Sequence, residues 1–170
     1  GPAALEWGRE GGMQAVDLGA LENLRGLKSF TLSGWMLRTE ARDSQRVLTW
    51  LNPSKAGEGV DLAVRGDGRL QLGVNQPAET SPVSTSPGHF PVVDAKAKDA
   101  GAAALAAWRW FAVTCDSTAS ADQVKFYAGG WNEDVRLIGK AAFAGAAGSK
   151  IGPLTIGNAA APFRSGRAFR

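Results

Sequence analysis

The chain has 170 residues, of which 44% are hydrophobic and 21% are charged, with 22 glycines and 8 prolines. This length fits one domain with a sizeable core, and the composition excludes disordered and collagen-like proteins. The formal net charge is +3, but the basic residues are scattered rather than interleaved with aromatic ones, so we expect no nucleic-acid partner. No apolar run approaches the roughly 18 residues of a membrane span, so we expect no span either.

The N-terminal part of the chain predicts short elements. Gly1-Pro2 is typical of the residues that remain after a tag protease cuts, so we expect a longer parent protein whose signal peptide this sequence would not show. Residues 4–7 and 13–19 are short extended pieces, which predict an opening hairpin or edge strands. Three leucines spaced by three residues within 21–27 predict one helical turn.

The next segments alternate between apolar and polar residues, which is the pattern of β-strands. Residues 29–40 and 45–52 each predict one strand, and residues 59–75 predict a hairpin around a tight glycine-rich turn. The aliphatic side chains of this hairpin all fall on one face: Val60, Leu62, Val64, Leu70, Leu72 and Val74.

A long interruption follows this hairpin. Residues 76–107 are rich in proline, serine and threonine, and they end in an alanine-rich run that predicts a short helix. Loops of this length are uncommon inside compact domains and usually carry function or flexibility. We therefore expect an insertion that covers or builds a binding surface.

The clearest feature of the second half is a central hairpin. Residues 110–115 and 123–128 predict two strands joined by a polar turn, with Phe111, Val113 and Cys115 facing the core. Cys115 is the only cysteine, so the chain has neither a disulfide nor a cysteine-based metal site. Its position on the apolar face predicts a buried, unreactive thiol.

The C-terminal part adds strands around residues 135–138 and 154–156. The chain thus predicts at least eight short strands and almost no helix, with turns at the regular spacing of a β-sandwich. We therefore expect one all-β domain, residues 1–170, built from two antiparallel sheets.

Several of these segments resemble, in the same order, the laminin-G-like domains of the concanavalin A-like lectin and glucanase superfamily. The resemblance is carried by SFTLSGWML at 29–37, WRWFAVTCD at 108–116, VKFYAGG at 124–130 and GPLTIGN at 152–158. It covers nearly the whole chain and implies a jelly-roll sandwich. Such domains serve as carbohydrate binders, as adhesion domains and as spacers attached to secreted enzymes. The resemblance therefore implies an extracytoplasmic parent protein, whether secreted, periplasmic or on the cell surface.

Two features depart from that family. Its members usually carry a further strand, similar to Gly-x-Ile-Asp-Asp-Val-Arg-Ile, after the Gly-Asn strand, and the sequence reaches Arg170 without it. We therefore expect a sandwich that lacks its last strand and has an open edge, which a segment of the parent chain or of a partner would complete. The second departure is the insertion at 76–107.

The residue patterns of catalytic sites are not found in the sequence. Glycosidases need two carboxylates across the scissile bond, whereas Glu133 and Asp134 are adjacent and point to opposite sides of an extended strand. His89 is the only histidine and lies in the proline-rich loop, without a Gly-x-Ser-x-Gly motif in the chain. Arg65-Gly66-Asp67 is the tripeptide that integrins bind, but a tight turn demands the same residue types. We therefore expect no enzyme.

Aromatic rings that stack on sugar faces are the remaining candidates. Of the six tryptophans, we select Trp110, Trp50 and Trp131 as ligand-binding candidates. Trp110 and Trp50 each lie opposite the expected core face of their strand, and Trp131 lies in a polar turn. The resemblance places Trp35 in the interior instead. Packing inside the sandwich is the alternative for each ring, since large aromatic side chains bury well.

The sequence does not decide whether the domain binds a metal ion. Many laminin-G-like domains hold a structural calcium ion with loop oxygens, and calcium takes about six to eight such ligands. The scattered carboxylates Asp17, Asp43, Asp61 and Asp116 show no spacing that identifies a site. We expect no other cofactor.

Two functions therefore remain. The first is a non-catalytic module of a larger extracytoplasmic protein that binds a glycan or polysaccharide. The second is a structural or protein-interaction module of the adhesion type, completed by a strand from the parent chain or from a partner.

Overall fold

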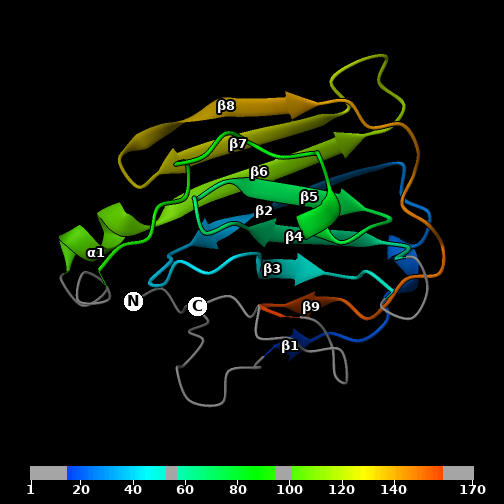
Figure 1. Ribbon diagram of the computed structural model, residues 1–170, viewed down its shortest axis with the longest axis horizontal. Helices are drawn as coiled ribbons and strands as arrows, with labels where there is room; N and C mark the ends of the chain where they lie inside the picture. Colours follow the sequence, from blue (N-terminus) through cyan, green and yellow to red (C-terminus); the bar gives the residue numbers. More distant parts are fainter. Residues whose placement is uncertain (1–14, 53–56, 95–100, 159–170) are drawn as a thin grey trace.

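The computed structural model describes residues 15–52, 57–94 and 101–158, and these form two antiparallel β-sheets (Figure 1). In order across the five-stranded sheet, the strands are β1 (Val16–Asp17), β9 (Thr155–Ile156), β3 (Gln45–Thr49), β4 (Val60–Val64) and β5 (Leu70–Val74). The four-stranded sheet contains, in order, β2 (Ser29–Met36), β6 (Arg109–Asp116), β7 (Val124–Gly130) and β8 (Glu133–Ala141). This arrangement confirms the all-β fold with two antiparallel sheets.

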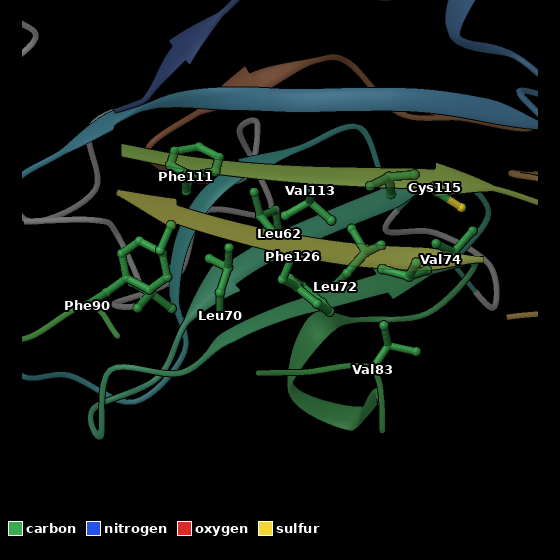
Figure 2. Close-up of a cluster of buried hydrophobic side chains, with 14 of the residues drawn as sticks. Leu62, Leu70, Leu72, Val74, Val83, Phe90, Phe111, Val113, Cys115 and Phe126 are labelled. Carbon is green, nitrogen blue, oxygen red and sulfur yellow. The ribbon is translucent and has the colours of Figure 1, made fainter. Parts of the chain in front are cut away.

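The core lies between the two sheets, as the alternation of the strands predicts. Figure 2 shows Phe111, Val113 and Phe126 from the four-stranded sheet facing Leu62 and Leu72 from the five-stranded sheet. All five side chains are buried. Burial of a large aliphatic or aromatic side chain contributes about 1.5–3 kcal/mol, so this two-sided cluster is the main source of stability.

The stretch of residues 75–94 after β5 covers the core rather than forming a free loop, and we call it the covering segment. It begins with a short 3-10 helix, η2 (Ala78–Thr80), and then runs along the edge of β5. There the amide of Leu72 donates to the carbonyl of Val83 at 3.0 Å. The side chains of Val83 and Phe90 turn into the core beside the aliphatic residues of β5 (Figure 2).

Two of the three short helices in the described part of the chain lie where the sequence predicts helical structure, and η2 is not predicted. The turn in the leucine-spaced segment is a 3-10 helix, η1 (Glu22–Leu24), and the alanine-rich run forms α1 (Ala102–Ala107) just before β6. Within the described residues no helix is long and apolar enough to cross a membrane. The extended piece expected at residues 4–7 lies outside the described residues.

β2 forms one edge of the four-stranded sheet. It pairs with β6 along its full length, from Ser29 opposite Asp116 to Met36 opposite Arg109, without a register shift. Within the part of the chain that the structure describes, β6 is its only partner strand. The other long edge strand of this sheet, β8, has two register shifts against β7.

Candidate functional site

The outer face of the four-stranded sheet carries the tryptophans that bear on function. Trp35 on β2 and Trp110 on β6 are directly opposite each other in the ladder, and the next position across the sheet is Gly129 on β7. Directly opposed side chains on one face of an antiparallel pair have Cβ atoms about 4.5–5.5 Å apart. The register therefore brings Trp35 and Trp110 together on the outer face.

Trp131 joins them from the turn between β7 and β8. Its ring centroid lies 6.2 Å from that of Trp35, and the two ring planes are tilted by 53°. Trp35 is 46% exposed and Trp131 is 56% exposed, while Trp110 is half-buried. We call Trp35, Trp110 and Trp131 the aromatic patch.

An ion pair holds the turn that presents Trp131. Arg109 at the start of β6 donates a hydrogen bond to the carboxylate of Glu133, the first residue of β8. This hydrogen bond keeps the pKa of Glu133 below its ordinary value. Gly130 makes room for the pair, since a Cβ there would lie 2.9 Å from Nη1 of Arg109. Both ends of the turn are thus tied to β6.

Two further rows of side chains follow the aromatic patch on the same face. The first contains Ser33, Ala112, Tyr127 and Leu137, in register across the four strands. The second contains Thr31, Thr114, Lys125 and Lys140, again in register. The face therefore changes from aromatic to a mixed row, which has a hydroxyl on β2 and the exposed Leu137 on β8, and then to a row of two threonines and two lysines.

Lys140, the residue of the second row that lies on β8, forms an ion pair. The Nζ atom of Lys140 lies 2.7 Å from Oδ2 of Asp122, and this hydrogen bond raises the pKa of Lys140. The charge of Lys140 is therefore neutralised by Asp122, just as the charge of Arg109 is neutralised by Glu133 at the aromatic end of the face.

Trp50 is buried, so the expectation that it lies opposite the core face is wrong. It is 1% exposed and meets Phe30 edge-on, with ring centroids 5.8 Å apart. The reason is a β-bulge between Arg46 and Leu48, which shifts the register against β4. Because the side-chain period of a strand is two, one extra residue moves every following side chain to the other face.

Trp35 is exposed, so the interior position that the family resemblance implies is wrong as well. Phe30 and Leu32 pack against the core, and Gly34 lies against the ring of Phe111. The alternation along β2 then places Trp35 on the outer face. The alternation of β2 therefore agrees with the surface position of Trp35, and the resemblance does not.

The other polar candidates are engaged locally. Nε2 of His89 lies 2.9 Å from Oγ of Ser86 within the covering segment, and burial together with Arg136 lowers the pKa of this histidine. At the hairpin tip, Asp67 pairs with Arg69, and Arg65 pairs with Asp43.

The four candidate calcium carboxylates lie on separate elements and have separate partners. Asp17 caps the amide of Gly19, and Asp116 accepts from the hydroxyls of Ser29 and Thr118. Asp61 pairs with an arginine inside the fold. Across the described ranges, no three histidine, cysteine or acidic side chains gather where they could hold a metal ion.

Comparison with known proteins found no relative of this chain. No protein-family model matches the sequence, and neither a curated protein nor a solved structure is detectably similar to it. The likeness to laminin-G-like domains, including the jelly-roll connectivity, therefore stays a prediction.

Proposed function

We propose that this domain is a non-catalytic carbohydrate-binding module of a larger extracytoplasmic protein, and that it binds sugar through the aromatic patch. The observation that carries the proposal is the exposed pair of Trp35 and Trp131 rings beside Trp110. Two large indole rings left half in water are costly unless something covers them, and contiguous exposed apolar surface marks binding sites.

The surroundings of the patch favour sugar as the ligand. The apolar face of a pyranose ring stacks on an aromatic face, while its hydroxyls need hydrogen-bonding partners nearby. Ser33 and Thr31 supply hydroxyls along β2, and Asn132 lies next to Trp131 in the turn. The pairs Arg109–Glu133 and Lys140–Asp122 are neutral as pairs, and Lys125 lies at the end of the face away from the rings, so the aromatic end suits an uncharged, hydroxyl-rich ligand.

The candidate residues are therefore Trp110 and Trp131, with Trp35 in place of the buried Trp50. Stacking and hydrogen bonding need no cofactor, so we expect binding to persist in a chelator.

Affinity gel electrophoresis and a glycan array test this proposal. We expect the wild-type domain to be retarded by at least one polysaccharide, and Trp131→Ala to lose the retardation. The matched control is Leu18→Ala, which removes another exposed apolar side chain, one that follows β1 at the edge of the five-stranded sheet. Both variants should unfold at the same temperature as the wild type, which would show that a loss of binding is not caused by misfolding. A wild-type domain that binds no glycan in either assay argues against the proposal.

Within the described ranges no strand pairs with the outer side of β2, which supports a second candidate, a protein-interaction module that accepts a strand. Natural sheets blunt their edges with charges, proline, bulges or a covering segment. The eight residues Ser29–Met36 contain no charge or proline, and their pairing with β6 has no bulge. The edge of β5, in contrast, is covered by the segment around Val83.

Sedimentation velocity over a range of concentrations tests this second candidate. An edge that accepts strands predicts self-association, and Ser33→Lys should weaken it because an edge lysine opposes pairing. The same variant leaves the tryptophans in place. A wild-type domain that stays monomeric at every concentration counts against strand addition.

A further inference from the structure

We infer that the aromatic patch selects single, twisted polysaccharide chains in solution over the flat faces of crystalline polysaccharides. This inference rests on the proposed function and names the class of ligand for the same site. It follows from the relative orientation of the Trp35 and Trp131 rings. The sequence alone does not show this orientation.

The two rings cannot form a flat platform. Their planes are tilted by 53° with centroids 6.2 Å apart. The exposed face of a crystalline polysaccharide holds its sugar rings in one plane, so the aromatic rings that stack on it must be coplanar. A single chain can rotate about each glycosidic bond, so successive sugars can turn their faces to follow tilted rings.

The tilt comes from the fold, because the rings are presented by different kinds of element. Trp35 stands on β2 opposite Trp110, where the pleat directs the side chain away from the sheet. Trp131 comes from the turn that the Arg109–Glu133 pair ties to β6. A flat strip would require rings that repeat along one strand or across one row, whereas the row beyond Trp110 continues with Gly129, against which the exposed side chain of Val135 lies, so the row adds no further ring.

The path away from the patch also suits a single chain. Along β2 the outward residues after Trp35 are Ser33 and then Thr31, at about 7 Å steps. A chain that starts on the rings therefore passes on to hydroxyl groups, which can bond sugar hydroxyls edge-on.

The test compares soluble and crystalline probes with the same intact domain. Affinity gels with soluble xylan, mixed-linkage β-glucan and galactan are run beside depletion assays on microcrystalline cellulose and chitin. We expect retardation by at least one soluble chain and no depletion by either solid. Trp35→Ala and Trp131→Ala should each weaken soluble binding by about tenfold or more, and Leu18→Ala should not.

The outcomes separate the inference from the proposed function. Depletion by cellulose or chitin that is lost in Trp131→Ala overturns the inference but supports sugar binding at this site. Soluble binding that both tryptophan variants retain overturns the inference and the aromatic patch as the binding site, because the sugar then binds elsewhere, but it leaves the domain a carbohydrate binder. No binding to any probe overturns the proposed function and the inference with it.

Discussion

Arg46 and Asp61 form a buried, two-pronged ion pair, with Nε 2.7 Å from Oδ1 and Nη2 3.0 Å from Oδ2. Asp61 is fully buried on β4, and its Oδ2 also accepts the amide of Ala78 in η2 at 3.0 Å. Burial disfavours the charge of Arg46, but the hydrogen bond and charge of Asp61, together with the charge of Glu79, outweigh it, so the pKa of Arg46 is raised. One carboxylate therefore joins two strands to the covering segment.

Replacing this carboxylate should be strongly destabilising. Asp61→Asn removes the fully buried carboxylate that pairs with Arg46 and, among the described residues, leaves only Glu79, 3.7 Å from its guanidinium, as a counter-charge. Breaking a buried ion pair typically costs about 3–5 kcal/mol. The measurement is the free energy of unfolding from a urea titration. Asp43→Asn, at the exposed pair with Arg65, is the control and should change little. Equal effects of the two substitutions would show that the buried pair contributes no more than a surface pair.

The covering segment should behave as part of the core. Phe90 is buried beside the aliphatic residues of β5, so Phe90→Ala should lower the free energy of unfolding by about 3–5 kcal/mol. Val92→Ala, at an exposed position two residues along, should have little effect. If the segment were a detachable loop, the two urea midpoints would coincide.

The close approach of η2 to β5 should make Gly73 intolerant of a side chain. A Cβ at Gly73 would lie 2.1 Å from the carbonyl oxygen of Gln76, so Gly73→Ala must displace the backbone of the covering segment. We expect a loss of about 1–3 kcal/mol in the free energy of unfolding. Gly66→Ala, where the nearest atom would lie 3.8 Å away, is the matched control. A stable Gly73→Ala protein would mean that the segment shifts freely.

The fold was predictable because most of its strands alternate regularly between apolar and polar residues. Phe111, Val113 and Phe126 face the core as their period of two requires, and so do the aliphatic residues of the hairpin at 60–74. Alternation fails at β3, where one inserted residue turns Trp50 inward. A bulge depends on the partner strand as well as on the local sequence, so residues 45–52 alone do not reveal it.

The candidate site was predictable only in part. Alternation correctly predicts the outer face for Trp110, whereas the interior position expected for Trp35 from the family resemblance is wrong. The contact between Trp35 and Trp131 joins residues almost a hundred positions apart. It depends on the register of three strands and on the Arg109–Glu133 pair, which no local pattern encodes.

The buried thiol of Cys115 should make stability fall in alkaline solution. Burial, with a smaller contribution from the charge of Asp116, raises the pKa of Cys115 to about 11 from an ordinary value of 9.0. The unfolded chain therefore releases this proton first, and the folded state loses stability as pH rises from about 9 to about 11. Urea midpoints of wild type and Cys115→Ala, measured at intervals across that range, isolate the thiol from the lysines and tyrosine that titrate nearby. We expect the wild-type midpoint to fall more steeply than that of the variant. Parallel curves would mean that the folded protein ionises Cys115 as readily as the unfolded chain does.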